Sequence, residues 1–378
     1  MICEDKECCG CGGCVEVCPQ NCIRMRMNEE GFYYPIVDGQ KCIACSRCKE
    51  ICPINSRKRI QTCTKAYAMI YKENRIRKKS ASGGMFYVLA KKILDLGGVV
   101  FGAALSEDCK EVKCIKVEEL DRIHLLMGSK YVQCSPPFIY TEVKEELRKG
   151  RKVLFSGTPC QVNACINFLS NENRNNLFTV DLICHGVPSP GVWKKYLEET
   201  VPNAKEVYFR DKTEGWKKWS LKIVDGSGSI FRERETKNIY IKGFLRDLYS
   251  RISCYNCQFK GLDRCSDITL GDFWNVERYV ADADDDMGTS LVFTHTSKGE
   301  EMIRSMEYDS NIYIQEVKTE NVSNENKMLH QSVALSKKRK KFFKQWKVLT
   351  VEDNVNKCLR RGFFSKIMGK IKWIIFRK

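Results

Sequence analysis

The sequence lacks several features that would assign it to a familiar class of protein. Its 378 residues contain no run of 18 or more apolar residues, so no membrane-spanning helix is predicted. They also contain no apolar N-terminal stretch of signal-peptide length, no GxGxxG and no Walker A motif. We therefore expect a cytoplasmic chain without a separate nicotinamide- or ATP-binding domain. Histidine is scarce, with four residues.

Cysteine, in contrast, is abundant, with 22 residues in the chain. Disulfides do not persist in the reducing cytoplasm, so this number does not indicate a disulfide framework. Cysteine-rich cytoplasmic chains more often bind metals. Metal binding is therefore the leading interpretation.

The net charge of +17 is concentrated at one end of the chain. Residues 336–378 contain 15 basic and two acidic residues, which gives +13 and leaves +4 for the first 335 residues. The basic character is thus a property of the tail. It is weak evidence for nucleic-acid binding, and we expect no nucleic-acid partner.

The first 57 residues contain one cysteine spacing twice. Cys-x2-Cys-x2-Cys-x3-Cys-Pro occurs at residues 8–19 and again at residues 42–53. It resembles two-cluster bacterial ferredoxins, in which the fourth cysteine of each run ligates the other 4Fe-4S cluster. The predicted ligands are Cys8, Cys11, Cys14 and Cys52 for one cluster, and Cys42, Cys45, Cys48 and Cys18 for the other.

Two zinc sites are the alternative, but zinc ligands usually come as two well-separated CxxC pairs. Cys9 and Cys22 do not fit the ferredoxin spacing and are interpreted as spectators, that is, as cysteines that ligate neither cluster. Between the two runs, residues 31–37 predict a strand that ends in a turn at Asp38 and Gly39.

The segment that follows predicts two strands around a helix. Residues 66–71 and 99–105 are apolar enough for buried strands, and apolar residues recur at helical spacing between 85 and 96. We expect the serines of the Ser80–Gly84 loop to cap this helix. A glycine-rich loop that opens a helix also suits an anion, although a plain helix cap is the commoner role.

Two further cysteines follow predicted strands at residues 152–155 and 178–183. Cys160 comes shortly after the first strand and Cys184 directly after the second. In an open α/β sheet these strand ends share one edge, so the two thiols are expected to meet. Together with the Cys254-x2-Cys257 pair they would provide four ligands for a third cluster. A zinc site that includes Cys265 or His185, and a CxxC redox pair, remain alternatives.

Residues 65 to about 315 resemble the coenzyme F-420 hydrogenase/dehydrogenase beta-subunit family. The resemblance rests on seven segments: Ser82-Gly-Gly, Gly128-Ser-Lys-Tyr-Val-Gln, Ser156-Gly-Thr-Pro-Cys-Gln, Asp181-Leu-Ile-Cys-His-Gly-Val-Pro, Cys254-x2-Cys257, Asp267-Ile-Thr-Leu-Gly-Asp-Phe-Trp and Gly288-Thr-Ser-Leu. Members of the family hold FAD and an iron–sulfur centre, and they transfer electrons between clusters and a hydride carrier, often a deazaflavin.

The resemblance implies a ligand set for the third cluster and a set of flavin contacts. The implied cluster ligands are Cys160, Cys184, Cys254 and Cys257, with Cys265 in reserve. The implied flavin contacts are Ser82, Gly83, Gly84, Ser129, Lys130, Thr158 and His185. A solvated lysine and a structural histidine are the alternatives for Lys130 and His185. No catalytic residue is assigned.

These inferences predict an α/β (α+β) flavoprotein core, an N-terminal ferredoxin-like domain and a basic helical C-terminal tail. The expected division is 1–57 for the ferredoxin domain, 64–145 and 146–320 for the two parts of the beta-subunit region, and 336–378 for the tail.

The expected function is that of an iron–sulfur flavoprotein oxidoreductase with two or three 4Fe-4S clusters and FAD. Electrons would pass between the clusters and a flavin that reduces or oxidises a hydride carrier or a small organic substrate. Relatives with a basic tail often accompany surface-polysaccharide enzymes, which suggests a link to that synthesis. The alternative is a non-catalytic electron-transfer subunit of a larger redox complex. Either function requires a redox partner protein or a deazaflavin-like substrate.

The tail has the pattern of a helix that lies on an anionic membrane. On a helix, most of its large apolar residues fall on one face, while Lys366 and Lys370 lie off it. These apolar residues are Phe363, Phe364, Ile367, Ile371, Ile374 and Ile375. This pattern predicts attachment to the inner face of the membrane. A helix that docks its apolar face on the protein core is the alternative.

Overall fold

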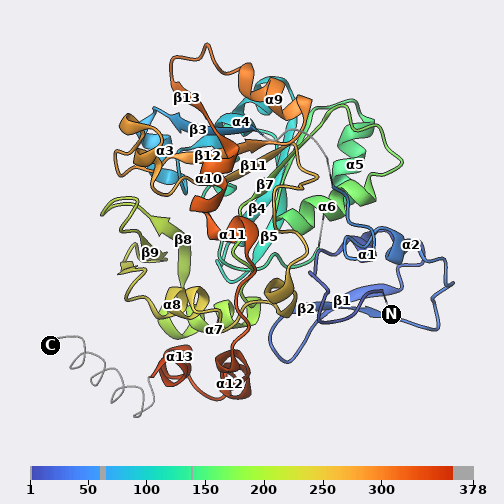
Figure 1. Ribbon diagram of the computed structural model, residues 1–378. Helices are drawn as coiled ribbons and strands as arrows, with labels where there is room; N and C mark the ends of the chain where they lie inside the picture. Colours follow the sequence, from blue (N-terminus) through green and yellow to red (C-terminus); the bar gives the residue numbers. More distant parts are fainter. Residues whose placement is uncertain (1, 60–64, 138, 361–378) are drawn as a thin grey trace.

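The computed structural model describes residues 2–59, 65–137 and 139–360. Figure 1 shows a small N-terminal module in blue beside a large mixed sheet, with a three-stranded sheet and the last helices below. In the described part of the chain, no helix is both long and apolar enough to cross a bilayer.

The N-terminal module is built around one antiparallel hairpin. Strands β1 (Ile23–Met27) and β2 (Tyr33–Val37) pair with each other, and each cysteine run carries one short helix, α1 (Gly13–Glu16) or α2 (Arg47–Glu50). The strand predicted at residues 31–37 is confirmed, with its start at Tyr33. Phe32 is fully buried just before it, where the module meets the rest of the protein.

The large sheet has eight strands in the order β13-β3-β12-β11-β7-β6-β4-β5. The four strands predicted at residues 66–71, 99–105, 152–155 and 178–183 are all present in it. Strands β4, β6, β7 and β11 run parallel, so their carboxyl ends share one edge. The bounds are β3 Lys65–Tyr71, β4 Val99–Leu105, β5 Val112–Val117, β6 Val153–Ser156, β7 Leu177–Leu182, β11 Ile268–Asp272, β12 Ser290–Thr294 and β13 Ile312–Val317.

This sheet joins the two parts of the chain that the sequence separated at residues 145 and 146. Strands β3 to β5 come from the first part and the other five from the second, so the two parts form one folding unit. The predicted boundary does not divide domains.

Helices cover both faces of the sheet because successive strand residues point to opposite sides. In β4, Val100 packs in the core with helix α4, whereas Val99 and Phe101 pack with α5 and α6. The helices around the sheet are α3 Asn74–Lys79, α4 Met85–Asp95, α5 Tyr140–Arg148, α6 Pro159–Phe168, α9 Ser297–Arg304, α10 Thr319–Val322 and α11 Lys327–His330.

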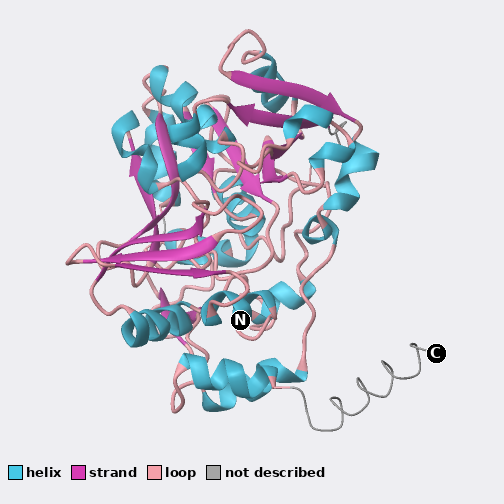
Figure 2. Ribbon diagram, turned by 90° about the vertical axis from the view of Figure 1, so that its left-hand side faces the viewer, coloured by secondary structure: helices cyan, strands magenta, loops and turns pink. Residues whose placement is uncertain are grey.

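A second core lies below the large sheet, around the three-stranded sheet β10-β9-β8 (Figure 2). The aromatic residues Trp193, Tyr240 and Tyr249 are its largest fully buried side chains. The elements are α7 Pro190–Thr200, β8 Ala204–Asp211, β9 Ser220–Asp225, β10 Ile230–Arg234, α8 Ile239–Leu245, α12 Lys337–Gln345 and α13 Val351–Leu359.

The first part of the basic tail belongs to this core. Phe342 of α12 and Val355 of α13 are fully buried in it. The tail residues for which a membrane-bound helix was predicted, from Phe363 to Ile375, lie outside the described residues.

Candidate metal centres

The first N-terminal ligand set lines one small cavity. Cys8, Cys11 and Cys14 of the first run lie around it together with Cys52 of the second run. This is the crossed arrangement that the spacing predicts. Gly10 is required for it, because a Cβ at this position would lie 2.5 Å from Gln133 Nε2 and 2.9 Å from Arg251 Cζ.

The same cavity contains Cys3, a thiol that the motif did not indicate. Its side chain forms hydrogen bonds with Cys52 and Cys8. The hydrogen bond from Cys3 and the nearby Arg251 guanidinium lower the pKa of the Cys8 thiol to about 6, although burial raises it. Cys3 stands outside the repeated spacing, so nothing in the sequence linked it to the other thiols.

The second N-terminal ligand set lies at the outer end of the module. Cys42 and Cys45 are exposed, whereas Cys18 and Cys48 are half-buried. Cys22, interpreted as a spectator, is buried with its Sγ 3.3 Å from Cys18 Sγ, and it also forms a hydrogen bond with Cys42. This set is therefore more accessible to solvent than the first one.

The four predicted core cysteines surround one cavity of about 410 Å³ at the carboxyl edge of the large sheet. Cys160 lies in the first turn of α6, where a capping box formed by Thr158 and Gln161 fixes the helix start. Cys184 follows β7, while Cys254 and Cys257 come from a 3₁₀ turn at Ile252–Asn256 and the residue after it. The structure thus brings together thiols from three separate segments.

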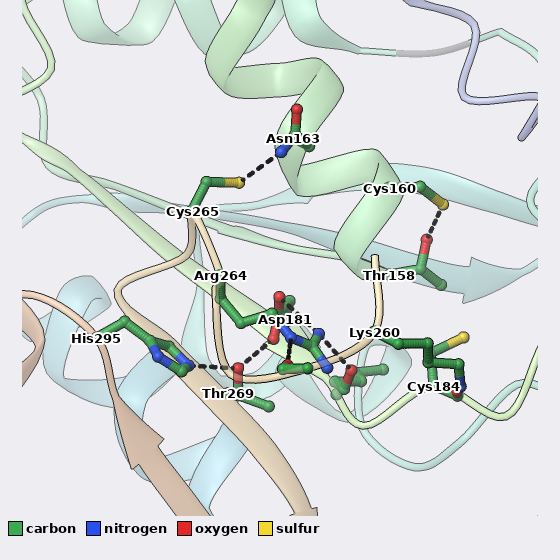
Figure 3. A network of polar contacts seen from close by, with 12 residues as sticks. Thr158, Cys160, Asn163, Asp181, Cys184, Lys260, Arg264, Cys265, Thr269 and His295 are labelled. Carbon is green, nitrogen blue, oxygen red and sulfur yellow. Dashed lines mark hydrogen bonds and ion pairs between the residues drawn. The ribbon is translucent and has the colours of Figure 1, made fainter. Parts of the chain in front are cut away.

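Cys265, the reserve ligand, does not line this cavity. Its Sγ accepts a hydrogen bond from Asn163 Nδ2 at 3.2 Å, while Cys160 Sγ lies 3.2 Å from Thr158 Oγ1 (Figure 3). Burial raises the pKa of the Cys265 thiol to about 12. The geometry favours the set without Cys265.

Cys9 lines both cavities, that of the first N-terminal set and that of the core set. Its thiol forms hydrogen bonds with Cys11 on one side and Cys160 on the other. Sequence spacing excluded Cys9 from the ligands and gave no sign of this position between the two sets. It lies there because the N-terminal module docks over the carboxyl edge of the sheet, so that Lys6, Glu7 and Ile54 also line the core cavity.

A buried and a half-buried cation lie beside these thiols, and they show whether the sites suit an anionic group. Arg251 is fully buried beside Cys8, and no carboxylate in the described ranges forms an ion pair with it. Lys260 lines the core cavity and donates to the Cys184 carbonyl oxygen at 2.6 Å. A 4Fe-4S cluster with four thiolates carries net negative charge, so the cations and thiols fit it. Across residues 2–59, 65–137 and 139–360, no three His, Cys, Asp or Glu side chains form a site for a single metal ion.

A buried ion pair lies below the core cavity. Arg264, which lines the cavity, pairs with Asp181 of β7 at 3.1 Å (Figure 3). Asp181 also accepts a hydrogen bond from Thr269 of β11, whose hydroxyl contacts His295 Nε2 at 2.8 Å. Burial and the Arg264 charge lower the pKa of His295 to about 3, so this histidine is neutral near pH 7. The network joins neighbouring strands directly behind the thiols.

The predicted flavin contacts fall into two groups rather than one. Thr158 and His185 line the core cavity. His185 Nε2 lies 2.9 Å from Asp247 Oδ1, and its ring packs edge-on against Phe244. The remaining contacts, in the Ser82–Gly84 and Ser129–Lys130 segments, are not part of this cavity's lining.

The serines of the Ser80–Gly84 loop do not cap helix α4, and this prediction is wrong. Ser82 donates to the Thr289 carbonyl oxygen and Ser80 to that of Ile76. Gly83 packs so closely that a Cβ would lie 2.5 Å from the Met69 carbonyl oxygen. The loop is thus fastened to the neighbouring strands, and its glycine is needed for that packing.

Two basic residues of β8 and its following turn connect the predicted flavin segments. Arg210 Nη1 lies 2.7 Å from Asp272 Oδ2 and 3.5 Å from the Tyr131 hydroxyl. Lys212 donates to the Ser82 carbonyl oxygen at 3.0 Å. Nothing in the sequence pattern indicated Arg210 or Lys212, because they lie in an amphipathic strand far from either loop.

This basic pair fits an anionic ligand. The Arg210 side chain is 6% exposed, and its Nε and Nη2 atoms are buried without a hydrogen-bond partner within the described part of the chain. Such donors are costly to leave unpaired, and a phosphate oxygen would satisfy them. Burial lowers the pKa of Lys212 to about 7, with the neighbouring Arg210 and Arg77 adding to the effect. Burial likewise lowers the pKa of Lys130, which donates to Leu125 and Met127, to about 7.

Two regions of the chain match known protein families. Residues 7–56 match the 4Fe-4S dicluster domain. Residues 150–320 match the family described as the C terminus of the beta subunit of coenzyme F420 hydrogenase/dehydrogenase.

Among curated proteins, none matches the chain. Among solved structures, a chain of the xenon-derivatised F420-reducing NiFe hydrogenase complex from Methanosarcina barkeri is 18% identical, with a TM-score of 0.49, over 79% of this chain and 91% of that chain. Residues 7–56 of the protein are thus similar to a 4Fe-4S dicluster domain, and residues 150–320 are similar to the C terminus of the coenzyme F420 hydrogenase/dehydrogenase beta subunit.

Proposed function

We propose that the protein is an iron–sulfur flavoprotein oxidoreductase that transfers electrons between its N-terminal thiol sites and a flavin by way of the core thiol site. The observation that carries this proposal is the position of Cys9, which lines the cavities of both the first N-terminal set and the core set. Two thiol sets that share a lining residue are suited to electron transfer between them.

Each thiol set has a distinct role in this proposal. The exposed set, with Cys42 and Cys45, is the point of contact for an external one-electron donor or acceptor. The first N-terminal set, whose four cysteines are buried, keeps the transferred electron away from water. When bound, 4Fe-4S clusters supply one-electron chemistry, and a flavin converts single electrons into a hydride.

The proposed flavin site is the basic group between the Ser82 and Tyr131 segments. The unpartnered guanidinium N–H groups of Arg210 would bind its phosphates, and Lys212 would add positive charge. The Trp216 and Trp274 rings stack on each other beside this group, with centroids 4.3 Å apart, and Arg210 lies 5.7 Å from the Trp274 ring centre. The group therefore combines positive charge with neighbouring aromatic rings.

The family name supports the following choice of electron partner and substrate. A deazaflavin of the coenzyme F420 type, or a small organic substrate, would exchange the hydride, and a protein would exchange the single electrons. We also propose a link to surface-polysaccharide synthesis, on the basis of the basic tail.

Anaerobic purification of the full chain, followed by iron, acid-labile sulfide and flavin analysis, tests this function. Three clusters of four irons predict about 12 irons per chain, together with one flavin. Clusters without flavin would instead support a non-catalytic electron-transfer subunit. Zinc without labile sulfide would contradict both functions.

A pair of variants tests the core ligand set. Cys257→Ala removes a thiol from the cavity and is expected to reduce the iron content by about four per chain. Cys265→Ala is the matched control, because this buried thiol binds Asn163 outside the cavity lining. It should retain the full iron content. Equal losses in both variants would contradict the assignment.

A further inference from the structure

Arg251 reaches from the core into the N-terminal module and contacts a ligand of the first thiol set. Its Nη2 donates to Cys8 Sγ at 3.5 Å, and its Nε donates to the Cys8 carbonyl oxygen at 2.6 Å. Nη1 donates to the Tyr33 carbonyl oxygen at 3.0 Å and to Gln133 Oε1 at 3.2 Å. The guanidinium also lies 4.0 Å from the centre of the Tyr34 ring.

These contacts leave a permanent positive charge in the interior without a carboxylate. The Arg251 side chain is fully buried, and its contacts are carbonyl oxygens, an amide oxygen, a thiol and two aromatic rings. A buried cation is expensive unless an anion accompanies it. Among these contacts, the only candidate anion is the Cys8 sulfur together with the cluster that it is proposed to ligate.

The backbone of Arg251 ties this charge to the core thiols. Its carbonyl oxygen accepts a hydrogen bond from Cys254 N–H at 2.9 Å, and its N–H donates to the Val187 carbonyl oxygen at 2.9 Å. Arg251 is therefore held by the segment that carries one core ligand while its guanidinium faces a ligand of the first set.

We propose that Arg251 raises the reduction potential of the cluster bound by Cys8, Cys11, Cys14 and Cys52. This inference rests on the proposed function. One-electron reduction adds one negative charge to this cluster, and the electron comes from the external reductant. A fixed cation in contact with a ligand sulfur stabilises the reduced form more than the oxidised form. Arg251 acts through Cys8 and is thus a positioning residue.

The outer thiol set differs in the environment of its charges. Lys41, Arg47 and Lys49 lie close to it in sequence, but all three are exposed. Solvent and salt screen such charges far more than a buried one. A buried cation is therefore expected to affect the potential of the inner cluster, whereas the exposed cations have little effect on that of the outer cluster.

Redox titration of the full chain, followed by electron paramagnetic resonance, tests this inference. Cys11→Ser and Cys45→Ser variants assign the signals of the inner and outer clusters. In Arg251→Gln, the reduced-to-oxidised ratio of the inner cluster at a fixed potential should fall about tenfold, which is about 59 mV for a one-electron couple. The outer cluster should keep its potential. In Arg251→Lys, which keeps a cation, the potential of the inner cluster should shift less than in Arg251→Gln.

Arg339→Gln is the matched control. Arg339 is also a buried arginine between the module and the core, but it pairs with Glu30, at 2.8 Å from Nη1 to Oε1, and contacts no ligand sulfur. The Arg339→Gln variant should leave the potentials of the inner and outer clusters unchanged. An unchanged inner potential in Arg251→Gln with both clusters present, or equal shifts of both clusters, would overturn the inference. Absence of iron and sulfide would instead count against the proposed function.

Discussion

Among single residues, Lys212 determines the pH range over which the proposed flavin site holds an anion. Its pKa of about 7 results first from burial and then from Arg210 and Arg77, with Asp272 and Asp285 acting in the opposite direction. An anionic ligand favours the charged lysine. Above pH 7 the free site must take up a proton on binding, so affinity is expected to fall as pH rises.

Flavin titration of the flavin-free protein between pH 6 and 9 measures this effect. The affinity should fall by up to tenfold per pH unit above about pH 7 for each proton taken up. Lys212→Met should bind flavin more weakly than the unmodified protein at pH 6. Its affinity should also depend less steeply on pH. A slope that is the same in both proteins would assign the proton to another group, such as Lys130.

The crossed ligand sets make a second prediction for single residues. Cys52 lines the cavity with Cys8, Cys11 and Cys14, whereas Cys18 lies with the second run. Cys18→Ala should therefore weaken the outer cluster signal, and Cys52→Ala the inner one. Electron paramagnetic resonance of the reduced variants distinguishes them. Loss of the neighbouring cluster in each case would indicate uncrossed sets.

The N-terminal cysteine motifs could be predicted from the sequence because three ligands of each cluster lie in one short run, and this run occurs twice. Arg251 and Arg210 could not be predicted in the same way. Arg251 contacts Cys8, which lies 243 residues earlier in the chain. A lone arginine in a sequence does not show which distant sulfur it will face, and only the docking of the module determines this contact.

At the level of elements, helix α12 links the N-terminal module to the core. Phe342 is fully buried against Tyr249 and Phe343, and Arg339 and Trp346 contact Glu30 and the Glu29 carbonyl oxygen. The sequence predicted a basic tail that lies on a membrane, with docking on the core as the alternative. The buried aromatic residues determine its packing instead, because one apolar side of a basic helix is enough for docking.

Phe342→Ala should lower the free energy of unfolding by about 3–5 kcal/mol, because it removes a fully buried aromatic ring. Lys340→Ala, an exposed position on the same helix, should change it by about 0.5 kcal/mol or less. Chemical denaturation followed by tryptophan fluorescence compares the two variants. Similar small effects in both would show that α12 contributes little to the fold.

Four strands of the large sheet were predicted from the sequence, whereas the other four and the order of the strands were not. Runs such as Val99-Val-Phe are apolar enough to indicate buried strands on local grounds. Strand β3, however, pairs with β12 and β13, more than 200 residues later in the chain. Pairing over that distance depends on the whole core, so the sequence divided one sheet into two parts.

For the whole molecule, the membrane prediction now concerns residues 361–378 alone. They contain six basic and no acidic residues, and each basic residue near an anionic surface contributes about 1 kcal/mol. The full chain should co-sediment with anionic liposomes at low salt and dissociate as salt rises. A chain that ends at Arg360 keeps the docked helices α12 and α13 and should remain in the supernatant. If both chains sediment alike, the last 18 residues are not a membrane anchor.

The unequal exposure of the two N-terminal thiol sets has a practical consequence for handling the protein in air. Oxidation of cysteine follows the accessibility of its sulfur, and Cys42 and Cys45 face solvent while Cys8, Cys11, Cys14 and Cys52 are buried. Oxygen is therefore expected to destroy the outer cluster first. A sample that has aged in air would retain most of its brown colour while it has already lost contact with its external partner, so colour alone is a poor measure of an intact preparation.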